Sequence, residues 1–383
     1  MILNIFITIL TILLFLFILT LIVVVHEFGH FITAKKFGVT VDEFSIGMGP
    51  LVSKKMYHGT QYSLRAFPIG GYVKMVGEEK VENTPGSFSV LAPWKRLIVI
   101  YAGVIMNFVL AVVIFAILAI KSGGVFFGST FDPNYQYPIG NTGHYKIGVQ
   151  AVQDGSPAQA AGLKTGDVID KVAGVDYSSP TEFFSILDQN NGKVVNFDVV
   201  PYLGGDQKNV NMLVRDKTTL KEGEGRVGID VIQTPFTKLQ YPFAWGIFTP
   251  VLQTANTTHN YVATLGFIIG KAVELNKPEI ATDSLSSPVG IYAVTRKVLD
   301  LNGFWGILTI TAILSLAIGI LNAVPFPALD GWHGVFIIFE WIFRRKVNER
   351  LYNAVTLAGF VLLLALGALV MLKDILNFNK LFM

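Results

Sequence analysis

The sequence contains no cysteine, and only 15% of its 383 residues carry a charge. The absence of cysteine excludes disulfides, thiolate zinc sites, iron–sulfur clusters and a cysteine nucleophile, so any metal ion must be held by histidine or carboxylate side chains. The 30 basic and 27 acidic residues leave a net charge of +3, too small and too scattered for a nucleic-acid surface, so nucleic acid is not expected as a partner. A hydrophobic content of 52% and a mean hydropathy of +0.53 are too high for a soluble chain of this length and predict a membrane protein.

Four uncharged stretches are long enough to cross about 30 Å of hydrocarbon as helices. They are residues 1–25, 97–120, 301–329 and 351–372. The first has neither a basic n-region nor a small-residue cleavage site, so we expect a retained helix rather than a signal peptide. A fifth uncharged stretch, residues 239–270, is polar at its centre and is expected to lie in the membrane interface as an amphipathic helix.

Basic residues in the connecting segments predict the orientation of the chain. Residues 35–96 carry nine basic and five acidic residues, and residues 340–350 carry four basic and two acidic. Both segments are therefore expected on the cytoplasmic side. The segment 121–300, with 15 basic and 17 acidic residues, is expected to be extracytoplasmic together with both termini.

The first apolar stretch ends in His26-Glu27-Phe28-Gly29-His30, which has the form H-E-x-x-H. Residues four apart lie about 40° apart around a helix axis, so His26 and His30 share a face and can both bind one zinc ion. Glu27 is then placed to act on a water in the open position. A chance grouping is disfavoured, because each ionisable side chain is costly in hydrocarbon unless it is paired or faces a cavity.

A catalytic zinc site normally has three protein ligands, so a third must come from elsewhere in the chain. Asp330 qualifies, because Pro325 and Pro327 break the preceding helix, and irregular backbone at membrane depth is tolerated where it lines a cavity. Glu340 is the rival ligand. It lies beside Trp341 at the cytoplasmic border, where a solvated carboxylate is the simpler expectation, so the sequence favours Asp330.

Residues 39–76 alternate apolar and polar side chains between glycines, which predicts a small β-sheet on the cytoplasmic side. An exposed edge near the metal could pair with an extended substrate, which makes Gly70 and Gly71 candidate substrate-binding residues. The sheet could equally pack beneath the helices without touching the substrate, and both interpretations stay open.

Residues 124–234 have a globular composition and predict a small α+β domain. A strand is expected over residues 147–152, a helix over 181–189, and closing strands over 194–201 and 228–232. The segment 156–169 resembles a PDZ signature. Such a domain could bind a peptide beside the strand at 147–152 or act only as a steric filter against bulky substrates, and we favour the filter.

Taken together, these motifs resemble the site-2 protease family of intramembrane zinc metalloproteases, in its bacterial RseP-like branch with one PDZ domain. The resemblance rests on H-E-x-x-H, on N-x-x-P-x-P-x-L-D-G at residues 322–331, on the PDZ-like insert, on residues 67–75 and 285–291, and on Ala102-Gly103 with Asn107. Two positions depart from the family pattern: Val104 stands where proline is usual, and Trp332 where a second glycine is usual. The second departure leaves the role of His333 open.

The resemblance implies an endopeptidase of the bacterial inner (cytoplasmic) membrane that cuts within transmembrane segments. Its partners would be the lipid bilayer and single-span membrane proteins, such as anti-sigma factors, or signal-peptide remnants. It implies Zn²⁺ on His26, His30 and Asp330, with Glu27 as general base. It also implies that Asn322 contacts the substrate or the oxyanion.

The expected fold class is a polytopic α-helical membrane protein with four transmembrane helices, a small cytoplasmic-side β-sheet and an extracytoplasmic PDZ (α+β) domain. The expected transmembrane helices occupy segments 1–34, with H-E-x-x-H, 97–120, 301–340, with N-x-x-P-x-P-x-L-D-G, and 351–372. Between them are expected the cytoplasmic-side β-rich loop 35–96, the PDZ domain 124–234, and an interfacial amphipathic helix with its linker over 239–297. The alternative function is a catalytically silent scaffold whose PDZ domain recruits partners. The presence of all three candidate ligands and the base disfavours it.

Overall fold

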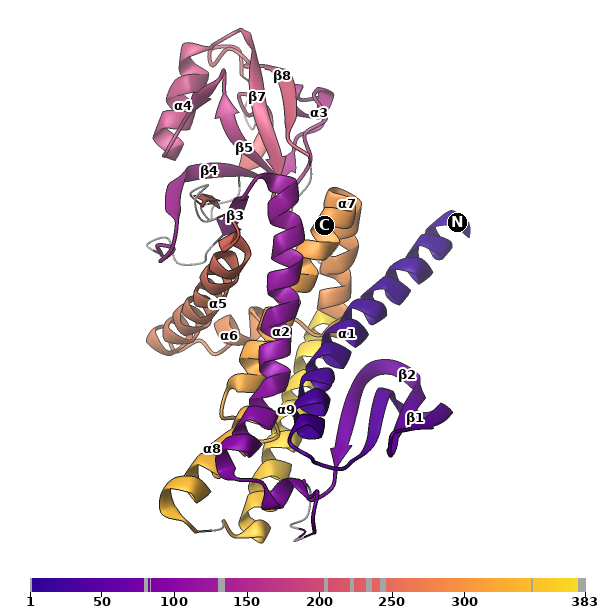
Figure 1. Ribbon diagram of the computed structural model, residues 1–383. Coiled ribbons are helices and arrows are strands. Elements are labelled where there is room, and N and C mark those ends of the chain that lie inside the picture. Colours follow the sequence, from indigo (N-terminus) through magenta and orange to yellow (C-terminus); the bar gives the residue numbers. More distant parts are fainter. Residues whose placement is uncertain are drawn as a thin grey trace. The chain divides into compact units, whose positions relative to one another are not determined.

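In the computed structural model the chain forms two compact units. Figure 1 labels their helices and strands. Unit 1 is formed by Met1–Ala111, Leu285–Thr295 and Thr311–Met383, and unit 2 by Val112–Ser284 and Arg296–Ile310. The residues that the structure describes are 2–78, 82, 84–129, 135–202, 206–220, 224–231, 236–241, 246–345 and 347–377.

Among these described residues, four helices are long and apolar enough to cross a membrane, which confirms the predicted number of spans. They are α1 (Ile2–Lys36), α2 (Pro93–Ser122), α7 (Pro288–Ala323) and α9 (Glu349–Leu376). Many of their large apolar side chains are exposed, including Phe17 and Leu357, each 63% accessible. Leaving such side chains in water forgoes about 1.5–3 kcal/mol each. These faces therefore suit contact with lipid.

The third span differs from its predicted extent of residues 301–340. Helix α7 begins earlier, at Pro288, where the Ser287 hydroxyl accepts hydrogen bonds from two backbone N–H groups of the first turn. It bends at Gly303, whose φ of 58° is outside the helical region. It ends at Ala323, before the two prolines, and the chain resumes in a separate helix, α8 (Asp330–Phe343). The charges near residue 300 made the start of this helix look like a loop in the sequence.

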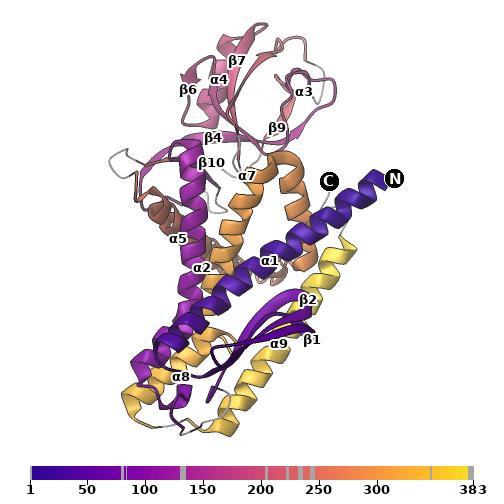
Figure 2. The same ribbon diagram turned by 45° about the vertical axis from the view of Figure 1, so that its right-hand side comes forward.

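The predicted small β-sheet of unit 1 is a single antiparallel hairpin of β1 (Val41–Tyr57) and β2 (Thr60–Met75), which lies beside α1 (Figure 2). Its base packs into a core with side chains of α1 and α2, including Ala34, Val41 and Val99. The Thr20 hydroxyl donates a hydrogen bond of 2.5 Å to the carbonyl of Pro68. A short 3-10 helix, η1 (Phe88–Val90), follows before α2.

Unit 2 contains one eight-stranded sheet with the path β3-β10-β4-β5-β7-β8. The strands on this path are β3 (Val125–Ser129), β4 (Asn141–Val152), β5 (Asp167–Val172), β7 (Val194–Pro201), β8 (Lys208–Leu213) and β10 (Phe236–Gln240). Off it, β6 (Val175–Asp176) pairs with β5, and β9 (Ile229–Val231) pairs with β4. Helices α3 (Pro157–Ala160) and α4 (Pro180–Gln189) complete the α+β domain, whose core includes Phe183 and Phe197.

The predicted peptide-docking strand, residues 147–152, lies inside this sheet. Ile147 and Gly148 pair with β5, while Val149, Ala151 and Val152 pair with β9. Peptide docking beside this strand stays a prediction, but the strand is already paired within the domain. The sequence could not show this, since β9 pairs with β4 from about 80 residues further along the chain.

The uncharged stretch 239–270 contains α5 (Thr249–Glu274), which is followed by the short helix α6 (Glu279–Asp283). The polar side chains of α5 face inward: Tyr241 donates from its hydroxyl to Gln253 Oε1 at 2.8 Å, and Asn256 Nδ2 donates to the carbonyl of Ile139 at 2.6 Å. The exposed side chains of α5 are mostly apolar, including Val262 at 52% and Ile269 at 57%, and His259 is also exposed. This arrangement inverts that of a helix on the surface of a soluble protein.

Candidate metal centre

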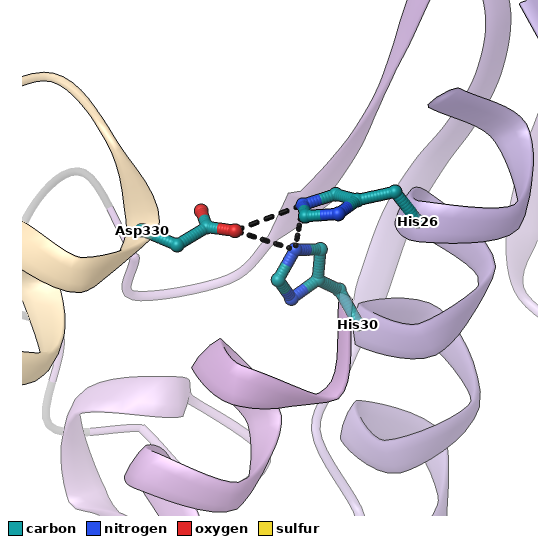
Figure 3. Close-up of side chains that lie close together, drawn as sticks. All are labelled: His26, His30 and Asp330. Atoms are coloured by element: carbon teal, nitrogen blue, oxygen red, sulfur yellow. Dashed lines mark hydrogen bonds and ion pairs between the residues drawn. The ribbon is translucent and has the colours of Figure 1, made fainter. Parts of the chain in front are cut away.

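Two histidines of α1 and the first residue of α8 bring three metal-binding atoms together (Figure 3). Nε2 of His26 lies 2.8 Å from Oδ2 of Asp330, and Nε2 of His30 lies 3.3 Å from the same oxygen. The two Nε2 atoms are 3.1 Å apart. Both imidazoles are buried, at 5% and 6% exposure, whereas the Asp330 side chain is 24% exposed.

Asp330 reaches the histidines because α8 starts directly against the end of α7. A Cβ on Gly331 would lie 2.4 Å from the carbonyl oxygen of Val324 and 2.5 Å from that of Ala323, so only glycine permits this approach. Ala328, with φ of 78°, supports the reversal of the chain just before it. The two prolines and Gly331 together place the aspartate at the beginning of a helix that faces α1.

The orientation of His30 shows what the cluster can hold. Its Nδ1 lies 2.8 Å from the carbonyl oxygen of Val99, and because a carbonyl only accepts, Nδ1 carries the proton. The Nε2 lone pair of His30 therefore faces His26 and Asp330. Zinc bonds of about 2.0–2.1 Å in a tetrahedral site separate ligand atoms by about 3.3 Å, close to the distances seen here. Two imidazole nitrogens and one carboxylate oxygen are a donor set that fits zinc.

Two glycines leave room for this cluster between α1 and α2. A Cβ on Gly29 would lie 2.3 Å from the carbonyl oxygen of Ala102, so the helices touch backbone to backbone. A Cβ on Gly103 would lie 2.4 Å from Nε2 of His30 and 2.6 Å from Nε2 of His26. The space beside the two Nε2 atoms therefore exists only because residue 103 has no side chain.

The other predicted site residues differ in what they contact, and only some of them adjoin the histidine helix α1. Gly71 brings β2 against α1, since its Cβ would lie 3.7 Å from Cγ of Glu27, the residue that follows His26. Gly70 instead adjoins Met48 within the hairpin, at 3.0 Å. Asn322 is half-buried in the last turn of α7. Glu340, the rival ligand, is in an ion pair of 2.9 Å with Arg96.

The structure also shows what Trp332 and its neighbour His333 contact. His333, one turn after Asp330 in α8, is in a short hydrogen bond with the hydroxyl of Tyr352 in α9. Trp332 donates from its indole nitrogen to Thr356 Oγ1 at 2.9 Å. Both residues therefore connect α8 to α9, and this contact holds the helix that begins with Asp330.

Sequence reasoning assigned no role to Asn107 or to the Val99 carbonyl, yet both contact the imidazoles. Asn107 is fully buried in α2, with Nδ2 3.2 Å from Nδ1 of His26. One signal was present in the sequence: Val99, Gly103 and Asn107 are four residues apart and share a face of α2. Of these three residues, Asn107 alone has a polar side chain.

An H-E-x-x-H helix and an aspartate that meet in a bundle of membrane-length helices define a membrane-embedded metalloprotease. The chain belongs to Peptidase family M50, whose model matches residues 14–366. This confirms the resemblance to site-2 proteases, and zinc is the cofactor.

Curated relatives cover nearly the whole chain. A protein of Clostridium perfringens named as a zinc metalloprotease is 32% identical over 358 residues, which cover 92% of this chain and 95% of the relative. One from Campylobacter jejuni, also named as a zinc metalloprotease, is 29% identical and covers 91% and 89%. Zinc metalloprotease RasP of Oceanobacillus iheyensis is 27% identical and covers 95% and 98%.

Proposed function

We propose that this membrane zinc protease is an endopeptidase that cuts within the transmembrane segments of other proteins, with His26, His30 and Asp330 as zinc ligands. The observation that carries the proposal is the convergence of two donor atoms from the membrane-length helix α1 with one from Asp330 at the start of α8. When bound, zinc lowers the pKa of a water ligand and polarises a carbonyl oxygen. The partly exposed side chain of Asp330 gives a substrate access to the same place.

Glu27 is the general base in this proposal. It follows His26 in α1 and lies beside β2, so it is next to the ligands without being one of them. Its carboxylate accepts a proton from the attacking water and later donates it to the leaving amine. Asn322, eight residues before Asp330 at the end of α7, is proposed to hold the substrate backbone or the oxyanion.

A transmembrane helix hides its peptide groups in its own hydrogen bonds, so the substrate must unwind before attack. The hairpin supplies strand edges for an extended segment, and Gly71 brings one of its strands next to Glu27. We therefore assign Gly71 to substrate binding. Gly70, which adjoins Met48, contributes through the shape of the hairpin.

The substrates are proposed to be single-span proteins or signal-peptide remnants, as in the RseP-like branch. The PDZ-like domain of unit 2 acts as a steric filter in this proposal. The pairing of β4 with β5 and β9 supports the filter, because a peptide would have to displace a strand to dock beside residues 147–152.

The proposed location is a bacterial cytoplasmic membrane, with the hairpin on the cytoplasmic side and unit 2's α+β domain and both termini outside. This orientation follows the excess of basic residues in segments 35–96 and 340–350. The mostly apolar outward face of α5, with Val262 and Ile269, is proposed to lie in the interfacial lipid.

The test is cleavage of a reconstituted single-span substrate by wild type and by Glu27→Gln, with bound zinc measured in both. Cleavage by wild type and its loss in Glu27→Gln, with zinc retained, is the expected result. Equal cleavage by both proteins would refute the assignment of Glu27. Zinc binding without any cleavage, for a panel of substrates with small outer domains, would favour the scaffold.

A further inference from the structure

We propose that Asn107 is a positioning residue for the metal centre: its side-chain oxygen accepts a hydrogen bond from Nδ1–H of His26 and so directs the Nε2 lone pair of His26 toward the metal. This inference rests on the proposed ligand set. It adds to that set a residue of α2 that touches neither the metal nor the substrate.

The amide of Asn107 is buried against the ring of His26. Its Nδ2 lies 3.2 Å from Nδ1 of His26, and the residue is 0% exposed. Its Oδ1 is buried and has no hydrogen-bond partner within the part of the chain that the structure describes. A buried acceptor without a partner is costly, and such an atom in a native site calls for an explanation.

The chemistry of a metal-bound imidazole supplies that explanation. If Nε2 of His26 binds the metal, the ring proton must be on Nδ1, and Nδ1–H needs an acceptor. An amide nitrogen cannot accept. Rotating the Asn107 amide by 180° exchanges Nδ2 and Oδ1 and moves no other atom, so that Oδ1 receives the proton of Nδ1. This rotation pairs the oxygen with Nδ1–H and fixes the tautomer that metal binding requires. It moves Nδ2 to the position that has no partner among the described residues, so the rotation is favoured by the tautomer of His26.

The second imidazole already has the same arrangement. Nδ1 of His30 is 2.8 Å from the carbonyl oxygen of Val99. One face of α2 therefore has three positions at intervals of four residues. Val99 offers an acceptor for one imidazole, Gly103 leaves a gap, and Asn107 offers an acceptor for the other imidazole. The gap at Gly103 leaves room for the two Nε2 atoms, and the acceptors on either side hold the two rings.

Helix α7 in turn holds Asn107. The Ser315 hydroxyl, fully buried, donates to the backbone carbonyl of Asn107 at 2.9 Å. A Cβ on Gly319 would lie 3.2 Å from Cβ of Asn107, so the two helices are in close contact here. Ser315 hydrogen-bonds to the backbone of Asn107 and not to its side chain. A substitution of Ser315 is therefore a matched control for the packing around Asn107.

The experiment measures metal binding by the full-length protein in lipid nanodiscs, by competition with a chelator for Zn²⁺ and from the absorption spectrum of bound Co²⁺. Three variants are compared with wild type: Asn107→Leu, Asn107→Asp and Ser315→Ala. Leucine keeps the volume but has no acceptor, so Zn²⁺ affinity should fall by about 10-fold to 100-fold, and the Co²⁺ spectrum should change. Aspartate keeps the acceptor, so its affinity and spectrum should stay near those of wild type, as should those of Ser315→Ala.

If Asn107 had only a structural role, Asn107→Asp would lose more Zn²⁺ affinity than Asn107→Leu, because a buried carboxylate would disturb the packing more than leucine does. Wild-type affinity in Asn107→Leu, or a greater loss in Asn107→Asp than in Asn107→Leu, overturns the inference. His26→Ala separates this failure from that of the proposed ligand set. If His26→Ala binds Zn²⁺ as wild type does, the ligand set is wrong; if it loses Zn²⁺ while Asn107→Leu keeps it, only the role of Asn107 is wrong.

Discussion

Oδ2 of Asp330 lies 2.8 Å from Nε2 of His26, although 304 positions separate the two residues in the chain. We expect Asp330→Asn to lower zinc affinity by at least about 10-fold and to abolish proteolysis, because the amide removes the charge of the proposed third ligand without changing its shape. Zinc content after dialysis and cleavage of a single-span substrate measure the two effects.

Glu340→Gln is the control for this prediction. Glu340 pairs with Arg96 at 2.9 Å, so its neutralisation should leave the zinc content at the wild-type value. Loss of zinc in Glu340→Gln with retention in Asp330→Asn would exchange the roles of the two carboxylates.

Gly103→Ala should disrupt the centre without altering any ligand. The new Cβ would lie 2.4 Å from Nε2 of His30 and 2.6 Å from Nε2 of His26, so at least one imidazole has to move. A displacement of about 1 Å at a catalytic group can cost about 100-fold in rate. We expect a loss of this order in cleavage, together with weaker zinc binding.

A second glycine-to-alanine change provides the comparison. Gly367 lies in α9, and a Cβ there meets no atom within 4 Å among the described residues. Gly367→Ala should keep full activity and gain up to about 1 kcal/mol in helix stability. If Gly103→Ala is as active as Gly367→Ala, the side chain at residue 103 does not confine the imidazole rings of His26 and His30.

The hairpin should lose stability in acid because of Glu43, which lies in β1 outside the membrane-spanning helices. Burial alone would raise the pKa of Glu43, but hydrogen bonds from Ser63, Arg65 and Tyr72 outweigh burial and lower it. The Arg65 Nη2 atom is 2.8 Å from its carboxylate. A lowered folded-state pKa gives stability that is present above the unfolded pKa of about 4.3 and is lost as the pH falls through the folded value.

Hydrogen exchange of the hairpin amides between about pH 3 and pH 7 measures this effect, after correction for the intrinsic exchange rates. Protection in wild type should decrease below about pH 4, and Glu43→Gln should remove that decrease. Asp42→Asn, which removes the neighbouring exposed carboxylate, is the matched control. If protection of the hairpin amides in Glu43→Gln still decreases below about pH 4 as in wild type, groups other than Glu43 cause the loss of stability in acid.

The features that follow local rules could be predicted from the sequence. The spacing of His26 and His30 depends only on the helical repeat, and the four apolar stretches depend only on length and composition. Pro325 and Pro327 indicated where the third span ends, because proline cannot continue a helix. The contacts that join distant segments were not predictable in the same way. The pairing of β9 with β4 and the contact of Asn107 with His26 depend on how whole elements pack, which no local pattern encodes.

The contacts of the polar side chains of helix α5 also depend on how whole elements pack. The polar centre of this helix predicted an amphipathic helix in the membrane interface, and Gln253 and Asn256 bond to Tyr241 and to the Ile139 carbonyl inside unit 2. The face left outside is mostly apolar. Because the chain contains no cysteine, a single spin label can be placed at Val262→Cys, Ile269→Cys or Lys277→Cys without any background labelling.

In lipid nanodiscs, labels at positions 262 and 269 should collide with dissolved oxygen, which concentrates in the bilayer, and should be shielded from a water-soluble nickel chelate. The label at position 277, an exposed lysine beyond the end of α5, should show the reverse. This contrast is expected because burying an apolar helix face in the interface is favourable, whereas a lysine head stays in water. Equal access of the nickel chelate to all three labels would place the apolar face of α5 in water and refute its contact with lipid.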